Sequence, residues 1–302
     1  MATTVVMPVG NQIALAQKYL DMLDEVYKRE SLTSMFEMPE DQVRWQGAKT
    51  VNLYELTPVA LANYDRNAGF VAGDVDGAWN PYTIEIDRGR SFLVDSMDDE
   101  ETMGLAFGRL LGEFERRFVI PELDAYRFAK LAGTTGIGSV QETISTSTAA
   151  VSAIDLATAS MDDAEVPYEG RVLFVNPTFY RFLKGGIERR VMNGEDDVNY
   201  NIEYYNDMQI ISVPSARFNT AVTLNNSTTA AGAGGYTATG NTINFMIVHP
   251  DAVMGVVKHR IPSIFTPAEN QEADGWKLNY RIYHDIWAKK NKVKGIYLNA
   301  PA

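Results

Sequence analysis

Residues 79–94 read Trp79-Asn-Pro-Tyr-Thr-Ile-Glu-Ile-Asp-Arg-Gly-Arg-Ser-Phe-Leu-Val94, and the acidic run Asp95-Ser-Met-Asp-Asp-Glu-Glu101 follows them. Apolar Tyr82, Ile84 and Ile86 alternate with polar residues, a pattern typical of a half-buried strand. The acidic run would complement the positive end of a helix dipole, so it marks a helix start near Ser96. The stretch therefore predicts an extended strand that leads into a helix, with a bulge or bend at Arg88-Gly-Arg90.

The helix after the acidic run has one apolar stripe and should be long. Its stripe consists of Met103, Phe107, Leu110, Leu111, Phe114 and Phe118. Pro121 lacks a backbone donor and should kink or briefly interrupt the helix, which then continues to about residue 131. At about 1.5 Å per residue, residues 98–131 would span on the order of 50 Å.

The segment before residue 79 predicts the other half of a hairpin. Val51-Asn-Leu-Tyr-Glu-Leu56 is rich in strand formers, and residues 57–81 contain many Gly, Asn, Asp and Pro. These residue types favour turns, so they suit a long hairpin tip.

The remaining chain predicts an amino-terminal helix and an α/β half. Apolar spacing favours a helix at 11–28. A glycine-rich hinge at 133–139 should precede the α/β half. We expect helices at 145–161, 177–186 and 250–258, strands at 171–176, 208–213 and 243–248, a flexible loop at 220–241, an alternating strand at 278–287, a basic turn at 289–294 and a last strand at 295–299.

Composition excludes several classes of protein. The chain has 302 residues, a net charge of −12 and no cysteine. An acidic chain lacks the global basic field that binds nucleic acid without sequence specificity, and the absence of cysteine removes disulfides and thiolate chemistry. The amino terminus does not resemble a secretory signal and the apolar runs are too short to span a bilayer, so we expect a soluble protein made in the cytoplasm.

Motifs that would carry catalysis are weak. The carboxylates at 95–101 could form an acid/base pair, but a helix start explains them more simply. Asp74-Val-Asp76-Gly77 is only a fragment of a calcium loop, and the glycines at 133–138 lack the Gly-Lys-Ser/Thr of a phosphate loop. The three histidines have no zinc spacing. We therefore predict no catalytic, metal or cofactor residues, and a carboxylate or metal-dependent hydrolase remains the minor alternative.

The carboxyl-terminal segment carries charge of the opposite sign to the whole chain. Residues 258–302 contain eight Lys or Arg and four Asp or Glu, a local net of +4 (8 − 4). Such asymmetry permits head-to-tail complementarity between copies. A solvated turn explains the basic run equally well.

Three segments carry a resemblance to a known family. They are Phe118-Val-Ile-Pro-Glu-Leu-Asp-Ala-Tyr-Arg-Phe-Ala-Lys-Leu-Ala132, Asn244-Phe-Met-Ile-Val-His-Pro-Asp-Ala-Val-Met254 and Tyr283-His-Asp-Ile-Trp-Ala-Lys-Lys-Asn-Lys-Val-Lys-Gly-Ile-Tyr-Leu298. With the order of elements, they make the chain resemble the major capsid proteins of tailed bacteriophages, whose fold is shared with encapsulins. The resemblance implies an α+β fold with an N-terminal arm at 1–45, an extended β-hairpin loop at 46–95, a spine helix and part of a peripheral domain at 96–139, an apical α/β domain at 140–255, and a return to the peripheral β-sheet at 256–302.

The resemblance also implies a function without catalysis. Such a protein forms hexamers and pentamers of an icosahedral shell in the virion, assembles in the host cytoplasm and encloses double-stranded DNA without sequence-specific binding. An encapsulin-type shell around cargo protein is the alternative within the same fold. No membrane partner and no cofactor are expected.

Two departures from the family pattern refine the expected partners. Some members crosslink a hairpin-loop lysine to a neighbour, but this chain has no lysine between Lys49 and Lys130. Some carry a cleaved amino-terminal scaffolding region, whereas here the arm reaches the hairpin by about residue 50, so we expect a separate scaffolding protein and a portal. The inter-subunit contacts that we predict are Asp65, Arg66, Asp74, Asp76, Trp79, Arg88, Arg90, Lys289, Lys290 and Lys292.

Overall fold

The computed structural model describes residues 31–38, 45–46, 49–64, 66–67, 69–97, 105–186, 203–227, 234–260 and 262–301. The helix predicted at 11–28 and the predicted contact residue Asp65 lie outside the described residues.

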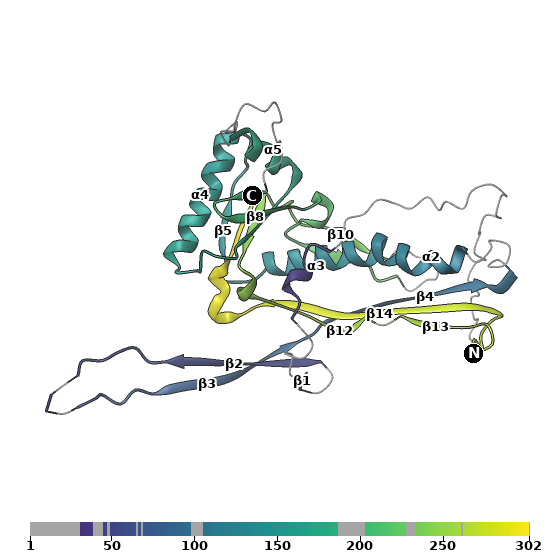
Figure 1. Ribbon diagram of the computed structural model, residues 1–302, viewed down its shortest axis with the longest axis horizontal. Coiled ribbons are helices and arrows are strands. Elements are labelled where there is room, and N and C mark those ends of the chain that lie inside the picture. The colour runs from purple at the N-terminus through teal and green to yellow at the C-terminus, as the bar shows by residue number, and fades with distance from the viewer. Residues whose placement is uncertain are drawn as a thin grey trace, which may run out of the picture.

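A two-stranded ribbon projects away from the body of the molecule (Figure 1). Strands β2 (Thr50–Pro58) and β3 (Val75–Thr83) pair antiparallel from Thr50 with Thr83 to Pro58 with Val75. The short β1 (Trp45–Gln46) pairs with the base of β2. The predicted hairpin is thus confirmed, with its tip at residues 59–74.

The single strand predicted over residues 79–94 is in fact two strands in different sheets. After β3, the chain resumes as β4 (Ile86–Asp95), which pairs with β14 (Gly275–Ala288) and has no pairing with β2. The hairpin expected over 46–95 therefore ends at residue 83. The bend predicted at Arg88-Gly-Arg90 is also wrong, because Gly89 lies in regular register opposite Arg281. The glycine serves close approach instead, since a Cβ there would lie 2.8 Å from the carbonyl oxygen of Tyr280.

The peripheral sheet is built around β14. Strand β4 pairs along one edge of β14, and β12 (Val253–Arg260) and β13 (Ser263–Phe265) pair along the other. The helix predicted at 250–258 is wrong: a single 3-10 turn, η5 (Pro250–Ala252), precedes β12. Pairing with β14 buries Val253, Met254 and Val256, which a surface helix would leave partly exposed.

The spine packs on one face of this sheet. It consists of α2 (Leu105–Phe114), a π-helical turn η3 (Glu115–Val119) and α3 (Ile120–Ala132). The predicted interruption by Pro121 is confirmed as this π turn, because the proline supplies no N–H to the residue one turn earlier. Leu111, Phe114 and Leu123 pack against Tyr280 and Ile282 of β14.

The apical half is a mixed sheet with helices on one face (Figure 1). The strand order is β5-β15-β11-β6-β8-β7, with bounds Gly138–Gln141, Ile296–Ala300, Phe245–Val248, Val172–Val175, Met208–Ser212 and Tyr204–Tyr205. Helices α4 (Ser147–Asp163) and α5 (Pro177–Gly186) pack on one face through Ile154, Phe179 and Leu183. Phe128 and Leu131 of α3 pack on the other face, together with Phe36 and Phe218. The end of the spine is therefore part of the apical core.

Several smaller elements complete the described chain. The arm contains a 3-10 turn, η1 (Ser34–Phe36), and further 3-10 turns are η4 (Ser215–Arg217) and η6 (Lys290–Gly295). The segment predicted as a flexible loop at 220–241 contains a small hairpin of β9 (Val222–Leu224) and β10 (Tyr236–Ala238), so these parts of it are paired strands. Among the residues described, no helix is long and apolar enough to cross a membrane.

Candidate functional site

The hairpin tip exposes an unusual number of large apolar side chains. Phe70 is 90% exposed, and Val59, Leu61, Tyr64, Val71 and Val75 are also exposed. Tyr64 and Phe70 contact each other across the tip with ring centroids 4.8 Å apart. Gly69 precedes Phe70 with a φ of +84°, a conformation that glycine adopts without strain. Scattered exposed apolar residues are ordinary, but a contiguous group on a projecting ribbon is typical of a contact surface.

The predicted contact residues of the hairpin also face solvent. Arg66, Asp74 and Asp76 are exposed, and Trp79 is 62% exposed. The Trp79 ring packs on Tyr54 of β2 at 5.0 Å, directly over Gly77, where a Cβ would collide with the Tyr54 ring. The ribbon therefore presents an aromatic pair on its shaft and an apolar tip beyond it.

The base of the hairpin is fixed to the peripheral sheet. Val51 and Ile84 are buried together with Tyr283 of β14. The Tyr283 hydroxyl donates to the carbonyl oxygen of Ile84 at 3.1 Å. The predicted contact residue Lys290 donates to Asn80 Oδ1 at 2.8 Å, which ties the basic turn to β3. The ribbon thus leaves the body in a defined direction.

A buried carboxylate joins the hairpin base to the spine. Asp285 is fully buried and accepts from Lys130 Nζ at 2.6 Å and from the Tyr126 hydroxyl at 3.0 Å. Its other oxygen accepts from the backbone N–H of Glu85 at 3.1 Å, in the link between β3 and β4. Burial and the neighbouring Asp285 raise the pKa of Tyr126, which keeps this phenol a hydrogen-bond donor. Charge pairing and hydrogen bonding together compensate for burying the carboxylate.

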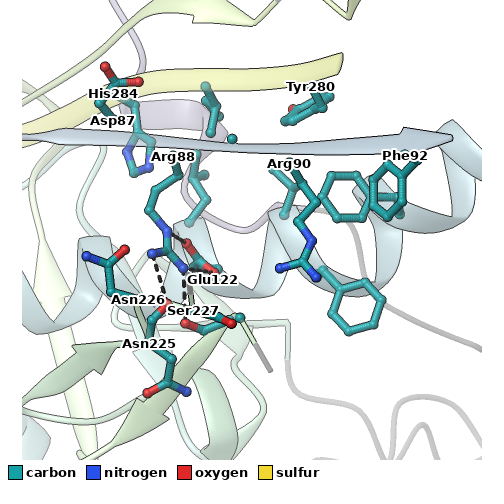
Figure 2. Close-up of a pocket in the computed structure, with 18 residues that line it drawn as sticks. Asp87, Arg88, Arg90, Phe92, Glu122, Asn225, Asn226, Ser227, Tyr280 and His284 are labelled. Atoms are coloured by element: carbon teal, nitrogen blue, oxygen red, sulfur yellow. Dashed lines mark hydrogen bonds and ion pairs between the residues drawn. The ribbon is translucent and has the colours of Figure 1, made fainter. Parts of the chain in front are cut away.

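A cavity of about 540 Å³ lies between β4, the spine and the β9–β10 hairpin. Its apolar side is formed by Phe92, Phe114, Phe118, Val119, Leu123 and Ile282. Figure 2 shows Arg88 at one end of the cavity, with its guanidinium directed at Glu122 and at the loop that carries Asn225. Arg88 Nε lies 2.7 Å from Glu122 Oε1, and the same guanidinium donates to the carbonyl oxygens of Asn225 and Gly235.

These contacts give Arg88 a role inside the subunit. Its guanidinium joins β4, α3 and the β9–β10 hairpin, so its contact with a neighbouring subunit stays a prediction. Arg90 also lines the cavity, two residues further along β4. Phe118 is 51% exposed at the cavity, and the Arg117 guanidinium lies 5.4 Å from its ring. The lining of the cavity is therefore largely apolar, and its charged side chains are the two arginines Arg88 and Arg90 and the two carboxylates Asp87 and Glu122.

His284 contributes to the lining of this cavity. It is buried, and burial together with the charges of Arg127 and Lys130 lowers its pKa to about 3. Its ring packs edge-on against Tyr126 at 5.7 Å. The histidine is therefore uncharged at neutral pH.

The lysines of the basic turn at 289–294 have more contacts within the subunit than the sequence indicates. Burial lowers the pKa of Lys289, and the neighbouring Lys292 lowers it further. Lys292 Nζ lies 3.8 Å from Asp251, and both side chains are largely exposed. Lys290 donates a hydrogen bond to Asn80, as described above. The structure thus brings Lys290 close to β3, whereas the inter-subunit roles of the three lysines stay predictions.

Sequence reasoning missed the buried joint between the arm and the spine. Asp124 is fully buried and accepts from Ser31, Leu32 and Thr33 of the arm at 2.7–3.3 Å. Arg217 Nη1 donates to the same carboxylate at 3.1 Å. Arg127, also fully buried, donates to Thr33 at 3.1 Å. Asp124 and Arg127 lie three residues apart on a mostly apolar helix segment, a charge pattern that could have indicated a buried polar joint.

Within the described ranges, no group of three or more His, Asp or Glu residues could hold a metal ion. The buried charges are paired within the subunit, and apolar side chains are exposed on the hairpin, at the cavity and at other positions such as Leu156 of α4.

Comparisons with solved structures identify the fold. The chain matches a structure from Mycobacterium phage Che8 with a TM-score of 0.66 and 15% identity, covering 96% of this chain and 98% of that one. It matches the mature capsid of bacteriophage PhiM1 with a TM-score of 0.67 and 11% identity, covering 96% and 92%. It matches the capsid of cyanophage P-SCSP1u with a TM-score of 0.61 and 14% identity, covering 95% and 93%. No family model matches the sequence, and no curated protein matches it significantly.

The chain therefore has the α+β fold found in phage capsids, over nearly its whole length. The fold combines a projecting hairpin, a long helix packed on a β-sheet, and a mixed sheet with helices. At these identities the likeness establishes the fold, and the predicted fold class is confirmed.

Proposed function

We propose that this chain is the major capsid protein of a tailed bacteriophage. It assembles with copies of itself into hexamers and pentamers of an icosahedral shell around double-stranded DNA. The shell is part of the virion and is built in the host cytoplasm, with a separate scaffolding protein and a portal as partners. The protein works by shape and self-contact and carries no cofactor.

One observation carries this proposal: an apolar hairpin tip that the described part of its own subunit leaves exposed. The ribbon leaves the body (Figure 1), and its tip exposes Leu61, Phe70 and Val71 to solvent. An isolated chain gains nothing from such a surface, because exposed contiguous apolar groups favour association. Two of the solved structures that share the fold, those of PhiM1 and P-SCSP1u, are phage capsids, which supports the same conclusion.

The acidic balance of the chain supports the proposed content. Nonspecific DNA affinity grows with the number of phosphates that Lys and Arg neutralise. With a net charge of −12, the subunit has no global basic field for that contact. A shell of such subunits would enclose DNA without binding it tightly.

Electron microscopy of the purified protein tests the proposal. Wild-type protein should form closed shells of uniform diameter. A variant in which residues 59–74 are replaced by a two-residue Asn-Gly turn should stay folded, because Pro58 and Val75 are already paired, but should form no shells. Normal shells from this variant would contradict the proposed role of the hairpin. Shells that hold protein cargo and no nucleic acid would favour the encapsulin-type alternative.

A further inference from the structure

The wall of the cavity beside the spine contains a buried polar atom that no described residue satisfies. His284 is 3% exposed and contributes to the lining. Figure 2 shows its ring extending from β14 toward Arg88, on the cavity side of the sheet. Among the described residues, its Nδ1 has no hydrogen-bond partner. Buried polar atoms in native proteins are almost always hydrogen-bonded, so an unsatisfied one at a cavity indicates a missing ligand or solvent molecule.

The charged side chains of the lining already have partners. Arg88 is paired with Glu122 and donates to two backbone carbonyls, as described above. Asp87 Oδ1 accepts from Arg281 Nε at 2.8 Å. Arg90 also has an interaction of its own. A charged ligand would have to compete with these contacts or leave its charge in a largely apolar lining, so the cavity favours an uncharged one.

The apolar part of the lining is rich in aromatic rings. The Phe114 ring centroid lies 4.8 Å from that of Phe92 and 5.5 Å from that of Tyr280, both edge-on, and 6.1 Å from that of Phe118. Aromatic rings attract further rings in offset or edge-on contacts. The volume of about 540 Å³ lies within the range of roughly 300–1,000 Å³ typical of ligand pockets. The cavity therefore suits a molecule with an aromatic body.

The unsatisfied nitrogen and the aromatic rings lie within the reach of one small molecule. His284 and Tyr280 both line the cavity and are four residues apart on β14, about 13 Å at roughly 3.3 Å per residue. A hydroxyl is the uncharged group that best suits a neutral histidine, because it donates to Nδ1 in one tautomer and accepts from Nδ1 in the other. A hydroxyl at His284 would thus direct the rings of the ligand toward Tyr280 and Phe114.

We propose that this cavity binds an uncharged aromatic alcohol or phenol of two or three rings, with its hydroxyl hydrogen-bonded to His284 Nδ1 and its rings against Phe114 and Tyr280. The site consists of residues from one subunit, so the proposal goes beyond the shell function and does not depend on assembly. A ligand that binds only the folded chain raises its stability in proportion to the logarithm of the ligand concentration. Bound here, it would strengthen the contact between β14 and the spine.

Equilibrium dialysis of the purified full-length chain against 2-naphthol tests the site. Naphthalene lacks the hydroxyl and 2-naphthoate carries a charge, so these two molecules are the comparison probes. The wild type should bind 2-naphthol about 2- to 12-fold more tightly than naphthalene, which is the ratio that one net hydrogen bond gives. Binding of 2-naphthoate should be the weakest of the three.

Four variants locate the binding. His284→Phe keeps a buried ring without its nitrogens and should bind 2-naphthol and naphthalene equally. Val119→Trp and Ser227→Trp come from different elements of the lining, and each should fill the cavity and weaken binding of 2-naphthol at least about tenfold. Leu156→Trp, on exposed α4 outside the lining, is the matched control and should bind like the wild type. Circular dichroism checks that each variant is folded.

The results that would overturn the proposal are distinct. They are an absence of saturable 2-naphthol binding, binding that both folded tryptophan variants retain in full, and tighter binding of 2-naphthoate than of 2-naphthol. A wild-type preference for 2-naphthol that persists in His284→Phe would refute the role of His284. Shell formation is scored separately by electron microscopy, so a failure of binding leaves the proposed function standing.

Discussion

Replacing Asp124 with alanine should detach the amino-terminal arm from the spine. In the wild type, this fully buried carboxylate accepts from Ser31 Oγ at 2.9 Å, from Thr33 Oγ1 at 2.7 Å and from the backbone N–H groups of Leu32 and Thr33. It also forms an ion pair with Arg217 at 3.1 Å. The alanine variant removes the acceptor from all of these groups at once.

The size of the expected stability loss follows from the burial of the ion pair between Asp124 and Arg217. Removing one member of a buried ion pair costs about 3–5 kcal/mol, because the other charge stays in a medium of low polarity. Hydrogen bonds to a charged group contribute about 1.5–3 kcal/mol each, but those that share one carboxylate are not additive. We therefore expect a loss of about 3–5 kcal/mol. With an unfolding entropy of about 2.1 cal/mol/K per residue, 302 residues give about 0.63 kcal/mol/K, so the thermal midpoint should fall by about 5–8 °C.

Hydrogen exchange measures where the loss occurs. The amides of Leu32 and Thr33 donate to Asp124, so a peptide covering residues 31–38 should lose protection in the variant. A peptide from α4 should keep its protection, since that helix packs elsewhere. The matched control is Asp163→Ala on exposed α4, which should change stability by less than about 0.5 kcal/mol.

Two results would refute this reasoning. One is a thermal midpoint for Asp124→Ala within the error of the control. The other is a lower midpoint with unchanged exchange at residues 31–38, which would place the loss outside the arm.

Three further predictions address other sites. His284 has a folded pKa of about 3, below its unfolded value of about 6.5, so the unfolded chain binds more protons. The neutral histidine contributes fully to stability above about pH 6.5. As the pH falls from there toward 3, the free energy of unfolding should decrease by at most about 1.4 kcal/mol per pH unit. Denaturant titrations should show a smaller slope for His284→Gln. A double-mutant cycle of Arg88→Met and Glu122→Gln should give a coupling of about 1–3 kcal/mol by denaturant unfolding, and additivity would show that the pair is unimportant. Gly255→Ala should cost about 1–3 kcal/mol by the same measurement, because a Cβ there would lie 2.9 Å from the carbonyl oxygen of Phe36, and an unchanged midpoint would show that the arm can shift freely.

The sequence predicts elements well where local signals agree with the fold. The helix 177–186 begins at a proline and ends at two glycines, and the structure has α5 with these bounds. The strand predicted at 243–248 contains the apolar run Phe245-Met-Ile-Val248, and β11 consists of these four residues, each of them buried. Local periodicity and capping were sufficient in these cases.

The failures arise where a distant partner decides the structure. Residues 253–260 follow a proline and an acidic residue, a helix-start signal, yet pairing with β14 makes them a strand. The alternation from residue 79 to residue 94 continues through Ile84 and Glu85, where the chain changes its partner from β2 to β14. That partner lies about 200 residues later, so no local pattern records the change.

The candidate site was predicted in part for the same reason. Turn formers and acidic residues marked the hairpin tip, and the predicted residues Arg66 and Asp74 are exposed there. The partners of Arg88 come from α3 and from a segment beyond residue 220, so its internal role required the tertiary structure. The cavity is likewise formed by elements that are distant in sequence.

The pairing of β14 has a consequence for how the subunit carries force. A pull on the hairpin ribbon enters the body at β4, and transfer across the sheet to β12 runs through β14. Of the described pairings, only Ile282, Tyr283 and His284 have β4 on one side and β12 on the other, and all three are buried. In mechanical terms, β14 connects two shorter strands, β4 and β12, which pair with its opposite edges. Tension on the ribbon would therefore load in shear the ten residue pairs that join β4 to β14 and the seven that join β12 to β14, and these three residues belong to both joints.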